Sequence, residues 1–204
     1  MMSRRPGESG SAVQAARKLA WLGAGLLVAL SVVVPLSAAQ GSVAPAAAGV
    51  GLKVQDRSHD NENPDNTLYA LYQNFNTGTV AVPLNTVTMR YWFTNEHPAD
   101  PLVFECDWAQ VGCANITGKF VVLASPVAGK ANTYLELSFN AAAGSLAPGQ
   151  NTGEIQTRVH HVRWSPFNTD LTYSFISDES FVYKDTQTVT LYVNGSLVWG
   201  AEPR

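Results

Sequence analysis

Apolar and polar residues alternate in short runs along most of this chain, and turn-forming residues separate the runs. Alternation with a period of two is typical of β-strands that bury one face. No segment after the N-terminal region shows a helical period. Runs rich in valine, threonine and aromatic residues predict strands at 69–75, 87–94, 102–106, 118–123, 133–139, 155–159, 172–176, 188–193 and 196–199.

Turn signals between these runs predict how the strands are connected. The strongest is Asn194-Gly195, which lies between two apolar runs. Both central residues of a tight hairpin turn need a positive φ, and Asn-Gly meets that requirement. Many short strands joined by frequent turns indicate an all-β fold, either an antiparallel sandwich or a jelly roll.

The N-terminal region departs from this pattern. Four basic residues within the first 18 positions precede an uncharged apolar run at 19–36. Small residues follow, so this order predicts a secretory signal at 1–39, cleaved after Ala39 or, alternatively, after Ala48. A retained membrane anchor is the other interpretation, because roughly 18 apolar residues can span a bilayer. We expect a linker at 40–50 and one secreted module at 51–204.

The charge balance narrows the choice of partner. The predicted signal holds four of the 13 Lys and Arg residues but one of the 16 Asp and Glu residues, which leaves 9 basic and 15 acidic side chains. A mildly acidic domain without a basic cluster argues against nucleic acid and against anionic membrane surfaces. We expect a monomer.

The two cysteines allow two interpretations. Cys106 and Cys113 have six residues between them, a spacing that permits a small disulfide loop in an oxidising compartment. Two buried thiols are the alternative. Neither cysteine has a second pair or a histidine cluster nearby, which argues against zinc.

The residues give little support to catalysis. Glycoside hydrolysis needs two carboxyl groups that face each other across a cleft, whereas Glu105 and Asp107 would share one strand face. His160 and His161 are adjacent, so on a strand they would point to opposite faces and would not bind one ion together. We expect both histidines at the surface. The chain also lacks a G-x-S-x-G sequence.

Tryptophans provide the candidate binding chemistry. Trp92 and Trp199 fall in apolar strands and are expected in the core. Trp164 lies in a polar loop, and Trp108 lies beside an acidic residue. An exposed ring of this size usually marks a binding site. The C–H face of a sugar packs well on an aromatic face, so these rings suit a carbohydrate.

The chain resembles family 3 carbohydrate-binding modules, the cellulose-binding type found in cellulosome scaffoldins and bacterial cellulases. The resemblance follows family order and spacing over essentially the whole region after the signal, and it implies a nine-stranded jelly roll. Its matching stretches are LKVQ at 52–55, NTG at 76–78, TMRYWFT at 88–94, FECDWAQVG at 104–112, ITGKFV at 116–121, YLELSF at 134–139, APGQNTGEIQTR at 147–158, YSF at 173–175 and VNGSLVWGAEP at 193–203.

The resemblance also implies a linear binding strip on one flat face. Trp108 and Trp164 correspond to stacking platforms. Asp107 and Arg158 correspond to a planar ion pair that continues the strip. Polar anchors for neighbouring chains correspond to Asn66 and Gln156. Such a face fits crystalline cellulose better than a single soluble chain, and it needs no reaction. The segment 112–117 is short here, so a tyrosine platform that scaffoldin-type members carry is missing.

The resemblance also implies a calcium site, with candidate ligands in two segments. Calcium prefers six to eight oxygen ligands, and two of the positions carry altered side chains. The sequence therefore leaves open whether a structural calcium ion binds. The candidate ligands are Thr94, Glu96, Asn168, Asp170 and Thr172.

Together these features predict a secreted, non-catalytic protein that adsorbs to crystalline cellulose or a related insoluble polysaccharide. An extracellular matrix or adhesion protein that binds another β-glucan or chitin is the main alternative. A polysaccharide-active enzyme is a third.

Overall fold

The computed structural model describes residues 48–57, 59–178 and 180–204. The predicted signal at 1–39 and most of the predicted linker at 40–50 lie outside these residues. Within them, no helix has the length and apolar character needed to cross a membrane.

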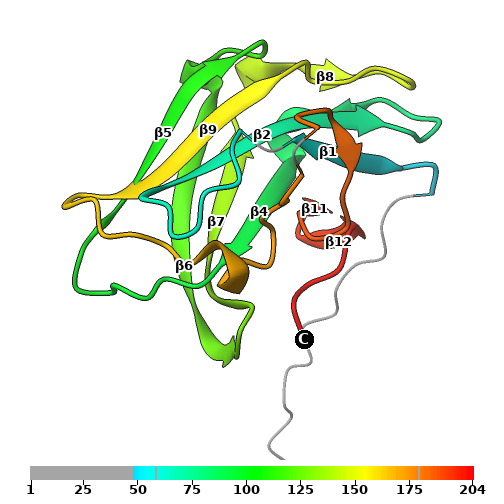
Figure 1. Ribbon diagram of the computed structural model, residues 1–204. Coiled ribbons are helices and arrows are strands. Elements are labelled where there is room, and N and C mark those ends of the chain that lie inside the picture. Colours follow the sequence, from blue (N-terminus) through cyan, green and yellow to red (C-terminus); the bar gives the residue numbers. More distant parts are fainter. Residues whose placement is uncertain (1–47, 58, 179) are drawn as a thin grey trace, which may run out of the picture. The chain divides into compact units, whose positions relative to one another are not determined.

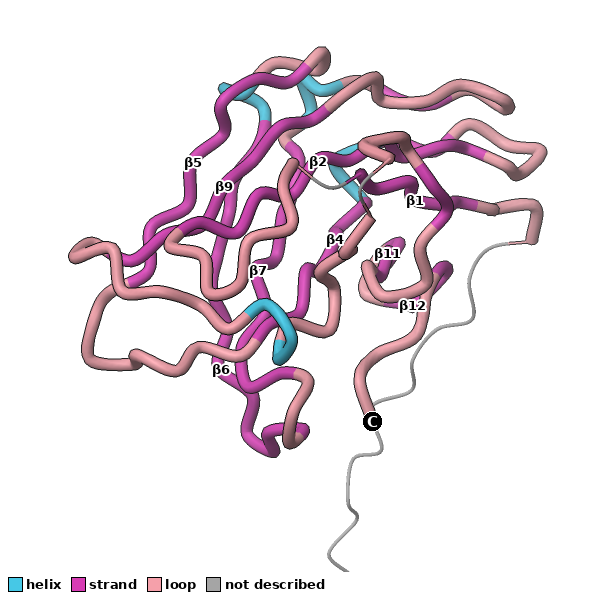
Figure 2. Tube along the Cα trace, viewed as in Figure 1, coloured by secondary structure: helices cyan, strands magenta, loops and turns pink. Residues whose placement is uncertain are grey.

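Two five-stranded antiparallel sheets make up the described part of the chain (Figures 1 and 2). The first sheet has the order β10-β1-β2-β9-β5, the second has the order β12-β11-β4-β7-β6, and β3 pairs with β8 separately. The strands are β1 (Leu52–Arg57), β2 (Thr67–Asn76), β3 (Val82–Pro83), β4 (Val87–Phe93), β5 (Leu102–Ala109), β6 (Ile116–Val127), β7 (Ala131–Phe139), β8 (Ser145–Leu146), β9 (Ile155–His161), β10 (Lys184–Asp185), β11 (Thr190–Val193) and β12 (Ser196–Trp199).

This arrangement confirms the predicted antiparallel β-sandwich. The chain crosses between the sheets repeatedly, for example from β4 to β5 and from β5 to β6, as expected of a jelly roll. Eight of the nine predicted strands form. The other four are β1, which is not among the nine, and the two-residue strands β3, β8 and β10, which are too short to show a pattern. Short 3₁₀ turns fill some connections: η1 (Leu84–Thr86), η2 (Cys113–Asn115), η3 (Ala141–Ala143) and η4 (Thr169–Leu171).

The core lies between the two sheets and follows directly from the alternation in the sequence. In β7 every second residue is buried, from Ala131 to Phe139. Aromatic rings from both sheets meet edge to face, such as Tyr72 with Tyr91 at a centroid distance of 6.4 Å. Burial of such apolar area is the main stabilising contribution, at about 25 cal/mol per Å².

Two tryptophan predictions can be compared with this core. Trp92 is buried as expected. Its ring packs on Tyr134 of the neighbouring strand in the same sheet, at a centroid distance of 4.7 Å. Its indole Nε1–H donates to Thr190 Oγ1 at 2.9 Å, so burial leaves no donor unpaired. Trp199 is partly buried and packs against the core cluster.

One predicted strand is wrong. Residues 172–176 contain threonine and aromatic side chains typical of strands, yet they form a turn in which Phe175 N donates to Thr172 O. Ser174 contacts β4 through its backbone, whose N–H donates to Trp92 O at 3.0 Å, and also through its hydroxyl group. Its Oγ accepts from Trp92 N at 2.8 Å and donates to Thr188 O at 2.6 Å. This hydroxyl therefore joins β4 to the chain that leads into β11.

We expect Ser174→Ala to lower the free energy of unfolding by about 1–3 kcal/mol, because it leaves a buried N–H and a carbonyl without their partner. Urea denaturation measures this loss. Ser177→Ala, at an exposed serine three residues along, is the control and should change stability by less than about 0.5 kcal/mol. Equal stability of the two variants would contradict the role given to the Ser174 hydroxyl.

Candidate functional site

A β-bulge in β5 determines which side chains reach the outer face of the first sheet. Glu105 pairs with Arg158 across to β9, but after Cys106 the register shifts, and Trp108 pairs with Gln156. Asp107 is therefore the extra residue. On a regular strand Asp107 and Trp108 would point to opposite faces, whereas the bulge exposes both.

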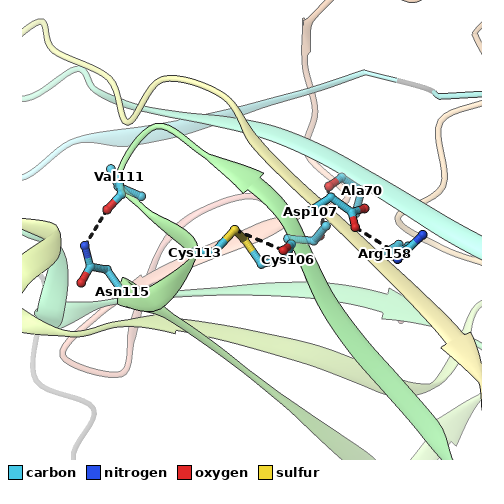
Figure 3. Close-up of a disulfide and its surroundings, with 8 residues drawn as sticks. Ala70, Cys106, Asp107, Val111, Cys113, Asn115 and Arg158 are labelled. Carbon is cyan, nitrogen blue, oxygen red and sulfur yellow. Dashed lines mark hydrogen bonds and ion pairs between the residues drawn. A yellow bond between two sulfur atoms is a disulfide. The ribbon is translucent and has the colours of Figure 1, made fainter.

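Arg158 lies between two carboxylates on this face. Its Nε is 2.5 Å from Glu105 Oε2 and 3.3 Å from Asp107 Oδ1. The expected contact between Arg158 and Asp107 is present (Figure 3), and Glu105 is the closer partner. Sequence reasoning set Glu105 aside, because only the register of β5 against β9 reveals that it lies directly opposite the guanidinium.

The electrostatics of Arg158 follow from these contacts. Burial lowers the pKa of Arg158, but the hydrogen bond with Glu105 and the charges of Asp107 and Glu105 outweigh burial, so its pKa is raised overall. The guanidinium is held by two carboxylates and remains charged. Both carboxylates are engaged with one cation on an open sheet face, which does not resemble a pair of catalytic acids facing across a cleft.

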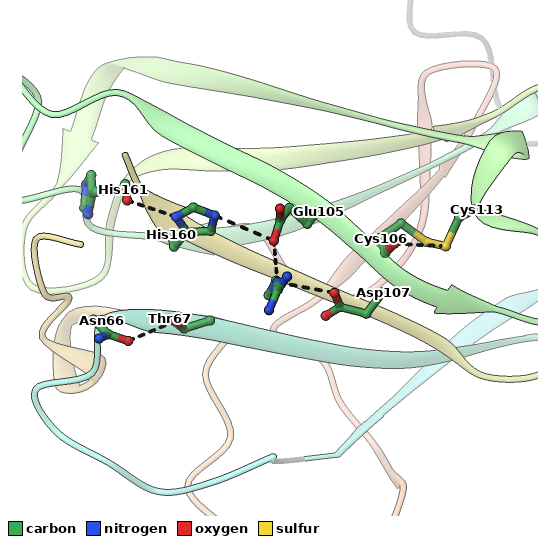
Figure 4. A network of polar contacts seen from close by, with 9 residues as sticks. Asn66, Thr67, Glu105, Cys106, Asp107, Cys113, His160 and His161 are labelled. Atoms are coloured by element: carbon green, nitrogen blue, oxygen red, sulfur yellow. Dashed lines mark hydrogen bonds and ion pairs between the residues drawn. A yellow bond between two sulfur atoms is a disulfide. The ribbon is translucent and has the colours of Figure 1, made fainter. Parts of the chain in front are cut away.

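His160 supports the ring of Trp164. The two rings stack with centroids 4.2 Å apart and planes 10° from parallel. His160 Nδ1 donates to His161 O at 2.9 Å, while Nε2 lies 3.7 Å from Glu105 Oε2. His160 thus connects the tryptophan to the ion-paired group. Figure 4 shows His160, Glu105 and Asp107 in one row.

The prediction that both histidines lie at the surface is wrong. His160 is 8% exposed and His161 is fully buried. His161 stacks on Phe167 with centroids 4.4 Å apart, and its ring nitrogens contact Ser165 O at 2.7 Å and Asn95 Oδ1 at 3.1 Å. The loop that follows β9 folds back over His161, which a strand-based prediction could not anticipate.

The same loop holds Trp164 outward. Trp164 has a φ of 60°, a conformation that is uncommon for a bulky residue. Its N–H donates to His161 O at 2.9 Å, and the Asp100 carboxylate accepts from Ser165 Oγ at 2.7 Å and from Arg163 N at 3.1 Å. These bonds stabilise the unusual backbone conformation, so the loop holds the half-exposed ring of Trp164 in place.

We refer to five outward-facing residues as the strip: Trp164, Arg158, Glu105, Asp107 and Trp108. Trp108 is 48% exposed and Trp164 is 52% exposed. Both lie on the outer side of the β9–β5 edge of the first sheet or in the loop after β9. Tyr69, on β2, lies opposite Arg158 in the register and adds a partly buried ring beside the strip.

The two predicted anchors lie at opposite ends of the strip. Asn66 is exposed and precedes Thr67, which pairs with His160 near the Trp164 end (Figure 4). Gln156 pairs with Trp108 at the other end, and its Nε2–H donates to Glu154 Oε1 at 2.9 Å. The amide orientation of Gln156 is thereby defined.

A disulfide closes the end of β5. Cys106 and Cys113 are joined, with their Cα atoms 5.6 Å apart, so the disulfide is found rather than the alternative of two thiols (Figure 3). Asn115 Nδ2 donates to Val111 O at 2.6 Å within the same short turn. The bridge and this bond hold the segment that follows Trp108 against the sheet.

The candidate calcium ligands come together in one loop cluster. Thr94 Oγ1 donates to Leu171 O at 2.8 Å, and Glu96 Oε2 accepts from Asn168 N at 3.0 Å. Asp170 Oδ2 accepts from Asn63 Nδ2 at 2.8 Å, and Thr172 Oγ1 is 3.5 Å from Asn168 O. Each carboxylate keeps a second oxygen. Among the described residues, no three His, Cys, Asp or Glu side chains form a metal-binding group.

Residues 53–200 match the family described as cellulose binding domain. The chain is 39% identical over 157 residues to a beta-mannanase/endoglucanase A of Caldicellulosiruptor saccharolyticus, a match that covers 77% of this chain and 12% of that protein. The chain thus spans a small part of such relatives.

Solved structures show the same fold. A family 3b module of the scaffoldin subunit ScaA from Acetivibrio cellulolyticus has a TM-score of 0.70 and 35% identity, over 75% of this chain and 97% of that one. Biomass-sensing modules of RsgI-like proteins from Clostridium thermocellum have a TM-score of 0.71 and 31% identity, over 75% and 99% of the two chains.

We expect His160→Ala to loosen Trp164, because the variant removes the ring on which the indole stacks. The free energy of unfolding should fall by about 1 kcal/mol. Heteronuclear NMR relaxation of the Trp164 indole N–H should report increased mobility. His59→Ala is the control, because it removes a comparable stack on Tyr69, with centroids 4.0 Å apart. An equally rigid Trp164 indole in both variants would contradict the supporting role of His160.

Proposed function

The chain belongs to the cellulose-binding-domain family, family 3 of the carbohydrate-binding modules, and on this premise we propose that it is a secreted, non-catalytic protein that adsorbs to crystalline cellulose through the strip. The family is one of binding modules that carry no catalysis of their own. The proposal includes a predicted signal at 1–39, a linker at 40–50, a module at 51–204 and a monomeric state.

The observation that carries the proposal is the arrangement of the strip. The half-exposed indoles of Trp108 and Trp164 lie at its ends, and the charge-paired guanidinium of Arg158 lies between them. Exposed indole faces are costly in water, and the C–H faces of glucose rings can cover them. The guanidinium of Arg158 is planar and also stacks on ring faces. Because Glu105 and Asp107 balance its charge, the strip suits a neutral polymer that lies flat.

The anchors complete the proposed contact. Asn66 and Gln156 are amides at the two ends of the strip, and amides can both donate to and accept from sugar hydroxyls. They would hold the register of the chain on the strip, or of a neighbouring chain on the same surface. An open sheet face has no walls to enclose a single chain, which favours an ordered surface as the target.

The relatives support this setting. Their names include endoglucanases, an exoglucanase and a cellulosomal scaffolding protein. Together with the predicted signal, these relatives lead us to place this chain outside the cell. Binding to another β-glucan or to chitin is the alternative outcome of a binding experiment, and release of reducing sugar would indicate an enzyme.

We expect Trp164→Ala and Trp108→Ala each to weaken adsorption to microcrystalline cellulose about tenfold, because each removes one stacking surface worth about 1–2 kcal/mol. Depletion isotherms measure the affinity, and circular dichroism checks that the fold is retained. Val122→Ala, at an exposed apolar residue on the second sheet, is the control and should adsorb like the parent protein. Unchanged affinity in both tryptophan variants would refute the strip.

Calcium is a further part of the proposal. An ion bound by Thr94, Glu96, Asn168, Asp170 and Thr172 would join the segment after β4 to the segment around η4. Calcium uses carboxylate and carbonyl oxygens, which both segments supply.

We expect millimolar calcium to raise the Tm above the value in EDTA by a few degrees, because an ion that binds only the folded state stabilises it. Glu96→Gln should remove most of this increase, whereas Glu62→Gln, at an exposed glutamate outside the proposed ligand set, should keep it. A Tm that is the same in calcium and in EDTA would count against the ion.

A further inference from the structure

A hollow of about 600 Å³ lies beyond the Trp108 end of the strip. Four segments far apart in the sequence form it: η1, the turn after β5, the region from η3 to β8, and the segment before β9. Its volume is within the range of about 300–1,000 Å³ found for small-molecule sites. The lining residues are Leu84, Gln110, Val111, Ala142, Ala143, Ser145, Leu146, Gln150, Asn151 and Thr152.

The lining is polar but carries no ionisable side chain. Val111, Ala142 and Ala143 are at least partly exposed and supply apolar area, while amides and hydroxyls supply hydrogen-bonding groups. Neutral polar groups set over an apolar surface match the chemistry of a sugar, which has hydroxyls at its edge and C–H groups on its faces. A phosphate, a carboxylate or a charged peptide would find no opposite charge in this lining.

Several of these polar groups have unused hydrogen-bonding capacity. Within the described chain, the side chains of Gln110 and Ser145 make no hydrogen bond to protein. Asn151 Oδ1 accepts from Gly153 N at 2.7 Å and Gln150 Oε1 accepts from Ala147 N at 3.1 Å, so both carbonyl oxygens are oriented. Each oriented amide leaves its NH₂ group without a protein acceptor and available to a ligand.

Gln110 connects the hollow to the strip. It comes two residues after Trp108, and its backbone N–H donates to Glu154 O at 3.0 Å, which continues the pairing of β5 with β9. Its side-chain amide lies directly over Gly153, where a Cβ would approach Gln110 Oε1 to 2.0 Å. Glycine at 153 therefore leaves room for the amide of Gln110, which lines the hollow.

We propose that this hollow binds a single neutral glucan chain, either a soluble cello-oligosaccharide or a free chain end that continues past Trp108. The proposal rests on the function proposed for the strip, but it assigns a different task to a different surface. The strip contacts an ordered surface, whereas the hollow takes sugar residues that have left that surface. The amides of Gln110, Gln150 and Asn151 would bond the hydroxyls, and the apolar side chains would contact the C–H faces.

Titration of the ¹⁵N-labelled protein with cellohexaose tests this site. We expect saturable NMR shift changes at the backbone amides of Gln110, Ser145 and Asn151. The double variant Gln110→Ala/Ser145→Ala should weaken binding of cellohexaose at least fivefold. Neither side chain makes a protein hydrogen bond, so this variant should fold normally. The matched control Gln73→Ala, on β2, should bind like the parent protein.

Trp164→Ala separates the two surfaces. We expect it to keep the shift changes at the hollow while its adsorption to crystalline cellulose falls. Three results would each overturn the proposed binding site in the hollow: cellohexaose shifts confined to the strip, the absence of shifts, or an unchanged affinity of the double variant. A parent protein that gives the hollow shifts but does not adsorb to crystalline cellulose would overturn the strip and leave the hollow supported.

Discussion

The β-bulge at Asp107 is the constraint on which the outer face depends. Without it, Asp107 and Trp108 would alternate between the core and the surface, and one of them would be lost to the strip. With it, the carboxylates of Asp107, at the bulge, and of Glu105, two residues before it, both contact Arg158. The disulfide between Cys106 and Cys113 closes the chain just beyond this point. Local irregularity in one strand thus produces the continuous outer surface that we propose binds the polysaccharide.

The polar and aromatic parts of this surface support each other. Glu105 contacts Arg158 and approaches His160, and His160 in turn stacks under Trp164. A surface made of two indoles and a charge-balanced guanidinium offers apolar faces and little net charge. That balance is consistent with the proposed binding of a neutral polysaccharide by a mildly acidic protein. The family membership of residues 53–200 agrees with this chemistry.

Much of the fold was accessible from the sequence, because period-two alternation and the Asn194-Gly195 turn are local signals. The segment 172–176 was misassigned, since its composition is typical of strands while the bonds of Ser174 to β4 and Thr188 are tertiary. Exposure of Trp164 could be predicted from its polar neighbours. Burial of His160 and His161, and the approach of Glu105 to Arg158, depend on register and on a loop that folds back. No local pattern encodes either of these.

Adsorption of the parent protein to microcrystalline cellulose, compared with chitin at equal surface area, tests the central claim most directly. The flat, charge-balanced strip predicts strong depletion of the protein from solution by cellulose, weaker depletion by chitin, and no release of reducing sugar. Full binding to chitin with no depletion by cellulose would contradict the account.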